Sequence, residues 1–277
     1  MDATVGGGGH AGVFRELGAD VLAIDRDPEA VAAARARLGE DGVRYAIGPF
    51  GSAEILAMVR AFHPDRILLD LGVSSHQLDD PVRGFTFRPG AALDMRMTPQ
   101  QGVTAADVLN TWTVERLADA FTELADERWG KKLARVIVKR RARSPFATSD
   151  DLVGAIRETL GPRSGPPDFA RLFQAVRIAV NDELDALAEA LPRALGMLRK
   201  GGRLAVIAFH SLEDRIVKHF LAREARDCVC PPGLPVCRCG HARSVALLTR
   251  KPVVASDAEA AANPPSRSAK LRVAERL

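Results

Sequence analysis

Four consecutive glycines near the start of the chain constrain its fold more than any other feature. They occupy residues 6–9, follow a short extended segment at 2–5, and lead into a helix-like run at 10–17. A second apolar run, 21–24, then ends at Asp25. Glycines let a backbone approach a ligand closely, and an acid at the end of the next strand can bind ribose hydroxyls. We therefore predict a nucleotide-binding βαβ unit rather than a plain tight turn, although turns also collect glycine.

Composition excludes few classes of protein. The chain has 277 residues, 47% of them hydrophobic and 27% charged, as expected for a globular protein with one large domain or two. A formal net charge of +4 permits a phosphate-rich partner without requiring one. No apolar run approaches the roughly eighteen residues of a membrane span, and the first residues show no export signal. We therefore expect a cytoplasmic protein with no membrane partner, whose four cysteines are reduced.

Strand and helix patterns alternate in the first third of the chain. Predicted strands cover residues 21–24, 43–47 and 66–71, and predicted helices cover 29–38 and 53–62. Such alternation favours a parallel, doubly wound sheet. Farther along, only helical patterns occur, at residues 105–110, 114–143 and 149–160. A helix over about 169–198, kinked or broken at Pro192, precedes two more predicted strands at 203–209 and 271–275.

The simplest architecture is an α/β sheet domain interrupted by a helical insertion. The first part of the core covers residues 1–96, the insertion 97–173, and the second part of the core, with a loop-rich end, 174–277. Only residues 2–5 precede the glycines, whereas a central strand usually has five or six residues. We expect a version extended upstream to be more stable, if one is encoded.

Two predicted strands end in polar residues. Asp70 lies at the end of one strand and His210 follows another. Because ligands of open α/β sheets bind outside the carboxyl ends of the strands, Asp70 is expected to face the same cavity as the glycine loop. For His210 two interpretations stay open: a side chain over this crevice, or a residue before a helix that Ser211 and Asp214 cap.

In the helical region, a basic stripe lies on one side of a helical wheel. Its members are Arg128, Lys131, Lys132, Arg135, Lys139 and Arg143. At about 100° per residue they occupy an arc of about 120°. Leu133, Val136 and Ile137 lie outside that arc, so another face is apolar. The stripe indicates either phosphate contact or an ordinary solvated face, and the pattern does not separate the two.

All four cysteines lie close together in the sequence, at Cys228, Cys230, Cys237 and Cys239. Residues 231–233, Pro-Pro-Gly, form a turn that can fold the two pairs toward each other. Four thiolates so placed can enclose one Zn²⁺, with His241 as a substitute ligand. The Cys-x-Cys spacing is tighter than in usual zinc knuckles, so inert thiols and a redox bridge remain alternatives. No metal ligand is assigned from the sequence.

Taken together, several long motifs resemble a bacterial family that methylates N4 of a cytidine in small-subunit ribosomal RNA. They lie at residues 2–10 (DATVGGGGH), 24–28 (IDRDP), 69–75 (LDLGVSS), 83–88 (RGFTFR), 93–97 (LDMRM), 173–184 (FQAVRIAVNDEL), 209–215 (FHSLEDR) and 267–272 (RSAKLR). The resemblance runs nearly end to end. Family members usually carry a longer segment before the glycine motif, and only some carry the cysteines.

The resemblance implies a fold, a cofactor and a target. The fold would be a Rossmann-like S-adenosylmethionine-dependent methyltransferase sheet domain with an inserted all-helical domain. The cofactor would be S-adenosylmethionine, and the target a cytosine in the decoding region of the ribosome. The partner would be small-subunit ribosomal RNA, either free or in the assembled subunit, and the oligomeric state, including a homodimer, stays open.

Seven residues match the cofactor pocket of the family: Gly8, Gly9, His10, Asp25, Phe50, Asp70 and Gln77. By this resemblance, the first three would hold the amino-acid end of the cofactor. Asp25 would bind the ribose, and Phe50 would lie against the adenine. Asp70 and Gln77 would complete the pocket.

The chemistry requires an acceptor for the protons of the target amine. The N4 lone pair of cytosine is delocalised into the ring, so the protein must hold this poor nucleophile near attack distance. Many amino-methyltransferases use an Asn/Asp-Pro-Pro-aromatic motif, but residues 70–73 here are Asp-Leu-Gly-Val. Asp70, Ser74 and His210 are the candidate acceptors, and we prefer Asp70. The target base must be unpaired or extruded.

Two rival functions remain. A nicotinamide-dependent oxidoreductase would be expected to carry the wider Gly-x-Gly-x-x-Gly spacing, which residues 6–9 lack. An RNA- or membrane-associated factor without turnover would have no need of Gly8, Asp25 and Asp70 together.

Overall fold

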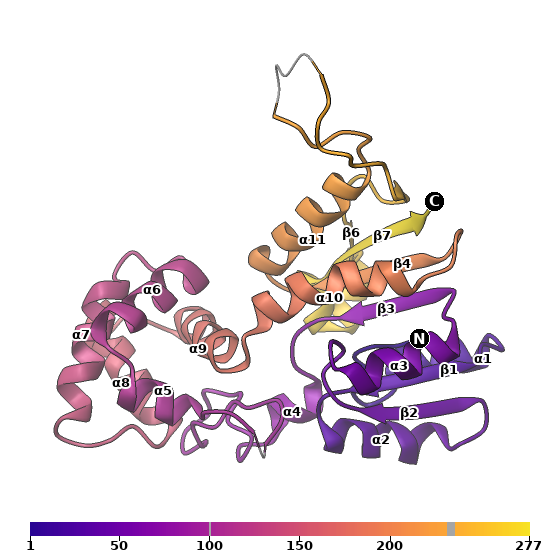
Figure 1. Cartoon of the computed structure of the whole chain (residues 1–277). Coiled ribbons are helices and arrows are strands. Elements are labelled where there is room, and N and C mark those ends of the chain that lie inside the picture. Colours follow the sequence, from indigo (N-terminus) through magenta and orange to yellow (C-terminus); the bar gives the residue numbers. More distant parts are fainter. Residues whose placement is uncertain (100, 232–235) are drawn as a thin grey trace. The chain divides into compact units, whose positions relative to one another are not determined.

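The computed structural model describes residues 1–99, 101–231 and 236–277, which form two compact units (Figure 1). We call Met1–Gly72 with Leu184–Leu277 the sheet unit, and Val73–Glu183 the helical unit. All named strands of the described residues belong to the sheet unit. The helical unit is larger than the 97–173 insertion expected from the sequence, because residues 73–96 and 174–183 also fold with it.

The first part of the sheet unit alternates helices and strands. Its elements are α1 (Gly9–Glu16), β1 (Val21–Asp25), α2 (Pro28–Leu38), β2 (Val43–Ile47), α3 (Ala53–Phe62) and β3 (Arg66–Asp70). Local sequence explains these bounds. Asp27 caps α2 by accepting from Glu29 N and Pro28 occupies the first turn, while Ser52 caps α3 by accepting from Ile55 N.

The second part adds the remaining strands. Its elements are α10 (Glu183–Met197), β4 (Arg203–Ala208), α11 (Ser211–Glu224), β5 (Val245–Leu247), β6 (Val253–Val254), α12 (Asp257–Ala262), the 3₁₀ helix η1 (Pro264–Ser268) and β7 (Lys270–Arg276). β1 pairs with β2 and β3 with β4 in parallel, whereas β7 is antiparallel to β4, β5 and β6. The sheet is therefore mixed rather than wholly parallel.

The first residues of the chain join the two parallel pairs. Asp2 forms parallel bridges to Ala23 of β1 and to Leu68 of β3. Its N–H donates to Leu22 O at 2.9 Å, and Ala3 N donates to Leu68 O at 3.0 Å. The order across the sheet is thus β2, β1, the first residues, β3, β4, β7 and β5.

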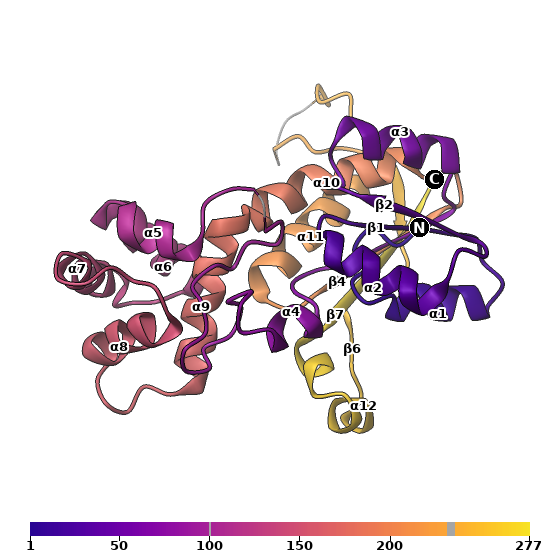
Figure 2. The same ribbon diagram turned by 90° about the horizontal axis from the view of Figure 1, so that it is seen from below.

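Helices cover both faces of this sheet (Figure 2). Alternating side chains of β1 enter two different hydrophobic clusters, since Leu22 and Ile24 pack with residues of α3, α10 and α11. Val21 and Ala23 pack with residues of α1 and α2. Burial on both faces explains why β1 and β3 are apolar throughout their middle.

The helical unit has its own core. Its helices are α4 (Ser75–Asp79), α5 (Ala105–Thr111), α6 (Val114–Ala125), α7 (Gly130–Arg141), α8 (Ser149–Leu160) and α9 (Pro166–Asn181). Buried side chains from α5 to α9 form one cluster, in which Phe121, Leu133 and Leu172 are at most 1% exposed. No helix in the described residues is long and apolar enough to span a membrane.

Two predicted helices are wrong in their continuity. The run 114–143 is two helices, because Asp126 ends α6 in the left-handed conformation with φ 50°. The run 169–198 is likewise divided into α9 and α10 at Asp182, which has φ 49°. Pro192 lies inside α10 and does not break this helix. Aspartate adopts this conformation more readily than most residues, yet it is also common within helices, so the pattern did not reveal the ends.

Candidate functional site

The glycine loop combines tight packing on one side with open space on another. Gly6 and Gly8 adopt positive φ, 49° and 77°. A Cβ atom on Gly8 would lie 3.1 Å from Leu38 Cδ1 of α2. A Cβ on Gly7 or Gly9 would meet no described atom within 4 Å. The loop can therefore present its backbone to a ligand without a side chain in between.

The loop leads directly into α1, which begins at Gly9. Its N-cap, Gly8, is left-handed and makes no side-chain capping bond. The first N–H groups of a helix carry partial positive charge and favour an anion such as a carboxylate. The structure thus places Gly8, Gly9 and His10 together at one helix start.

Asp25 ties the glycine loop to the end of β1. Its Oδ2 accepts from Gly6 N at 2.9 Å and its Oδ1 accepts from Asp27 N at 3.0 Å. Burial raises the pKa of this carboxyl, and the hydrogen bonds from the backbone oppose that shift. A carboxylate has about four acceptor positions, so this group can still accept from a ligand hydroxyl.

Phe50 lies in the loop after β2, close in sequence to Gly48, whose N–H donates to Asp25 O at 2.8 Å. The ring is only 8% exposed and packs in the cluster that contains Ile24 and Leu69. Most of its surface is therefore core, and only a small part can meet a ligand.

His10 and Asp70 form the polar centre of this end of the sheet. His10 Nε2 lies 3.4 Å from Asp70 Oδ2, and Asp70 Oδ1 is buried without a hydrogen-bond partner among the described residues. The hydrogen bond to Asp70 raises the pKa of His10, with burial as a smaller opposing cause. The structure therefore places the Asp70 carboxyl beside His10, which directly follows the glycine loop, and a shared ligand cavity stays a prediction.

Two residues here were missed from the sequence. Asp2 is 1% exposed, and burial raises its carboxyl pKa to about 6. Thr4 bonds to both Asp2 and Asp70. Its N–H donates to the Asp2 carboxyl at Oδ1 (3.2 Å), and its Oγ1 accepts from the backbone N–H of Asp70 (2.7 Å). The available signal was an acid and a hydroxyl just before the glycines.

Gln77 belongs to the helical unit and serves the start of α4. Its Oε1 accepts from Ser74 N at 3.0 Å, and Gln77 N donates to Ser74 Oγ at 3.2 Å. This reciprocal pair resembles a capping box. Both Ser74 and Gln77 thus have a local structural role.

His210 is the N-cap of α11 rather than a free side chain. Its Nδ1 accepts from Glu213 N at 3.4 Å, while Glu213 Oε2 accepts from Phe209 N at 3.0 Å. The predicted cap by Ser211 and Asp214 is therefore wrong by one residue. Asp214 instead receives the guanidinium of Arg272 through two bonds of 2.7 and 3.2 Å, which lowers its pKa. His210 Nε2 lies 3.1 Å from Glu213 Oε1, yet this buried nitrogen has no hydrogen-bond partner among the residues that the structure describes.

Comparison with known proteins decides the family. The model of the MraW methylase family matches residues 1–277. A relative from Gemmatimonas aurantiaca named "Ribosomal RNA small subunit methyltransferase H" is 51% identical over 98% of this chain and 88% of its own length. Relatives of the same name from Heliobacterium modesticaldum and Thermomicrobium roseum are 49% and 50% identical over the whole chain and cover 92% and 87% of their own length.

The chain belongs to the MraW methylase family. The resemblance inferred from the motifs is confirmed at the level of the family, and the protein is a methyltransferase. Other motifs that carried the resemblance lie in the helical unit, where they form a structural network.

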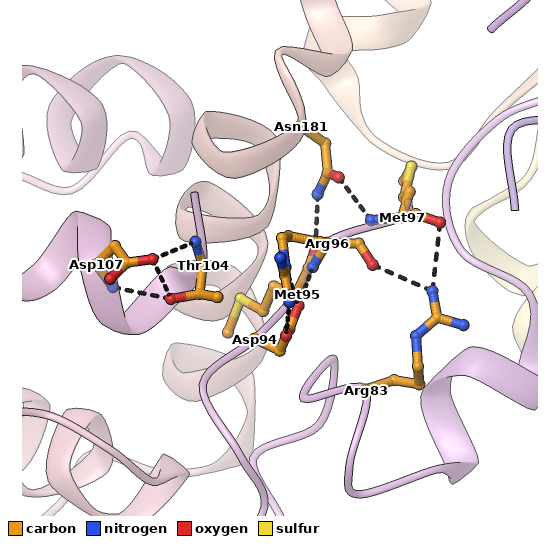
Figure 3. A network of polar contacts seen from close by, with 8 residues as sticks. All are labelled: Arg83, Asp94, Met95, Arg96, Met97, Thr104, Asp107 and Asn181. Carbon is orange, nitrogen blue, oxygen red and sulfur yellow. Dashed lines mark hydrogen bonds and ion pairs between the residues drawn. The ribbon is translucent and has the colours of Figure 1, made fainter. Parts of the chain in front are cut away.

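In this member of the MraW methylase family, Asn181 anchors the segment 94–97 (Figure 3). Its Nδ2 donates to Met95 O at 2.7 Å and its Oδ1 accepts from Met97 N at 2.8 Å. Arg83, 7% exposed, donates to Arg96 O and Met97 O. A Cβ on Gly84 would lie 2.4 Å from Ala92 O, so the close approach of these segments requires glycine.

The basic stripe of this family member is exposed but not uniform. α7 begins at Gly130 and ends at Arg141, so Arg128 and Arg143 lie outside the helix. All six basic side chains are exposed, whereas Leu133 and Ile137 are buried. Lys132 Nζ donates to Thr159 O at 2.9 Å, so this lysine also supports α8.

Proposed function

We propose that the protein transfers a methyl group from S-adenosylmethionine to N4 of a cytidine in the decoding region of small-subunit ribosomal RNA. The full-length match to the MraW methylase family carries this proposal, supported by relatives whose name is that of a ribosomal RNA small-subunit methyltransferase. In this proposal the sheet unit is a Rossmann-like methyltransferase domain and the helical unit is an all-helical insertion into it. The strand order with an antiparallel β7 supports the first assignment.

The residues of the sheet unit fit the proposed cofactor. The open positions at Gly7 and Gly9 and the uncapped start of α1 suit the carboxylate of its amino-acid end. Asp25 would accept from the ribose hydroxyls, and the exposed edge of Phe50 would meet the adenine. When bound, S-adenosylmethionine supplies an electrophilic methyl group on a sulfonium.

Asp70 would accept a proton of the target amine in a hydrogen bond. Its Oδ1 is buried without a partner, whereas its Oδ2 faces His10. A protonated His10 would fix the orientation of the Asp70 carboxyl through a charge-assisted hydrogen bond. The alternative acceptors are less suitable, since Ser74 bonds to Gln77 and His210 caps α11. Gln77 stays part of the proposed pocket, next to its bonds with Ser74.

The basic stripe of α7 would contact ribosomal RNA phosphates in this proposal. Its exposure and its positive charge support that role. Free RNA and the assembled subunit are both candidate substrates, a homodimer is compatible with the proposal, and a cytoplasmic location follows from a ribosomal target.

A transfer assay tests the proposal. S-adenosylmethionine carrying a tritiated methyl group is incubated with free ribosomal RNA or with small subunits from a strain that lacks the gene. Methyl transfer to N4 of one cytidine, mapped by mass spectrometry of nuclease fragments, is the expected result. Methylation at carbon 5 or at several scattered sites would contradict it. Thermal stabilisation by NAD but not by S-adenosylmethionine would favour the oxidoreductase instead.

A further inference from the structure

The four cysteines converge in space as well as in sequence. They lie in the segment between α11 and β5, and all four Sγ atoms are within 4.8 Å of one another. Three of the separations are 3.5 Å for Cys237–Cys239, 3.8 Å for Cys239–Cys228 and 4.0 Å for Cys230–Cys237. Of the turn predicted between the pairs, residues 232 and 233 lie outside the described part of the chain.

These separations match the edges of a metal–thiolate tetrahedron. Zinc–sulfur bonds are about 2.3 Å long, and the sulfur–sulfur edge of a regular tetrahedron of that size is about 3.8 Å. A disulfide would instead need about 2.05 Å between two sulfurs, and all four cysteines are free. The arrangement thus suits one ion shared by four sulfurs better than it suits two bridges.

Backbone amides surround the cluster as they do in thiolate sites. Val229 N donates to Cys239 Sγ, Cys230 N to Cys228 Sγ and Arg238 N to Cys230 Sγ, each at 3.4 Å. Such bonds stabilise negative charge on sulfur and orient the ligands of a metal. Three of the four sulfurs therefore already receive an outer hydrogen bond from the backbone.

Apolar packing does not explain why the cysteines meet. None of the described residues within 226–243 is buried. In its described part, the segment is held near its ends, where Ser244 N donates to Glu224 O at 2.9 Å and His241 Nε2 lies 3.1 Å from Arg223 O. Because its ring nitrogen faces the end of α11, His241 is not needed as a ligand.

We propose that Cys228, Cys230, Cys237 and Cys239 bind one Zn²⁺ as a structural site that holds the segment between α11 and β5 in place of a hydrophobic core. Soft thiolate ligands favour zinc among the divalent ions, and four protein ligands leave no open position for catalysis. The site is separate from the methyl-transfer residues, so the proposal does not depend on the proposed function.

Elemental analysis of the whole protein, purified without a metal-affinity tag, gives the first test. We expect about one zinc per chain and four thiols that react with a thiol reagent only after a chelator is added. Zinc near zero with four freely reactive thiols would overturn the site. Iron or copper in place of zinc, or a mass loss that indicates disulfides, would equally overturn the assignment.

Variants separate ligands from neighbours. Cys230→Ser and Cys237→Ser should each lose zinc on dialysis, whereas His241→Ala, the matched control, should keep about one equivalent. Loss of zinc from His241→Ala would overturn the all-cysteine ligand set, and full retention by both serine variants would overturn the site. Circular dichroism reports whether each variant is folded.

Cobalt substitution tests the geometry. Co²⁺ in a tetrahedral site of four thiolates should give intense visible bands and sulfur-to-metal charge transfer, and Zn²⁺ should displace it. The weak spectrum of an octahedral cobalt ion would overturn the tetrahedral site.

Discussion

His10 Nε2 lies 3.4 Å from Asp70 Oδ2, although the two residues come from the start of α1 and the end of β3. The second oxygen of the same carboxyl, Asp70 Oδ1, is buried and has no hydrogen-bond partner in the described residues. A buried acceptor without a donor costs free energy, so we infer that a bound molecule supplies the missing hydrogen bond.

Replacing Asp70→Asn tests this pair. Because the hydrogen bond to Asp70 is the largest cause of the raised pKa of His10, that pKa should fall toward its ordinary value of 6.5. Methyl transfer should slow by at least about tenfold, since the amide both lacks the charge and can present a donor. NMR titration of the histidine signals measures the first effect, with exposed His63 as an internal reference. An unchanged His10 titration would mean that the pair does not form in solution.

Asp25→Ala should weaken S-adenosylmethionine binding by roughly tenfold to a hundredfold, because hydrogen bonds from two ribose hydroxyls to a carboxylate contribute about 1.5 to 3 kcal/mol. The same change removes the carboxylate that accepts from Gly6 N and Asp27 N. Asp25→Asn is the matched control, since its carbonyl still accepts one of these bonds. Calorimetry measures both affinities. If neither variant binds more weakly, Asp25 is not part of the site.

The basic stripe is tested by Lys131→Ala, Arg135→Ala and Lys139→Ala in one protein. This set spares Lys132, which also bonds to Thr159 O. If the three residues meet phosphates, RNA binding should weaken and its logarithmic salt slope should fall by about one per contact. S-adenosylmethionine affinity should stay unchanged.

The matched control for this charge loss removes three exposed basic residues from the sheet unit. Arg37, Arg60 and Lys200 serve this purpose because all are exposed and none lies in the proposed site. Equal salt slopes for the two triple variants would show that the basic stripe is a solvated helix face without phosphate contacts.

Asp2 should make stability depend on pH in a defined window. Burial raises its folded-state pKa from 3.8 to about 6, so the folded protein holds this proton more tightly than the unfolded chain. Its contribution to stability is therefore full below pH 3.8 and is lost as the pH rises through about 6. The total change is at most about 3 kcal/mol, at 1.36 kcal/mol per pKa unit.

Asp2→Asn isolates this effect, because the amide oxygen can still accept from Thr4 N. As the pH rises from 4 to 7, the free energy of unfolding of the variant should increase relative to that of the parent protein, by up to about 3 kcal/mol. Urea unfolding at several pH values gives the difference. A difference that stays constant across this range would show that Asp2 does not titrate as described.

Gly84→Ala should destabilise the protein by about 2 to 4 kcal/mol. At φ 74°, the added Cβ would lie 2.4 Å from Ala92 O and 2.7 Å from Asp94 N, so the backbone has to move. Gly90→Ala is the control, because φ is 77° but no described atom lies within 4 Å of the new Cβ. This control should cost only about 1 to 2 kcal/mol of backbone strain. Equal losses in chemical unfolding would mean that crowding at Gly84 is relieved cheaply.

The sequence by itself determined the elements whose signals are local. The glycine loop, Asp25 at the end of β1, the Ser52 cap of α3 and the paired cysteines all follow from neighbouring residues. The apolar face of α7 followed from periodicity, since Leu133 and Ile137 are buried as expected. Helix ends at Asp126 and Asp182 did not, because a left-handed aspartate carries no distinct sequence signal.

Only the tertiary structure decided which distant residues meet. Asp70 reaches His10 because the first residues of the chain lie between β1 and β3. The pKa of the Asp2 carboxyl is raised because this position is buried. His210 is a cap and not a free side chain because it accepts from Glu213 N. The four cysteines form one cluster because the chain between α11 and β5 brings their sulfurs together. Long-range hydrogen bonds and burial set these outcomes, and neither is encoded in local sequence spacing.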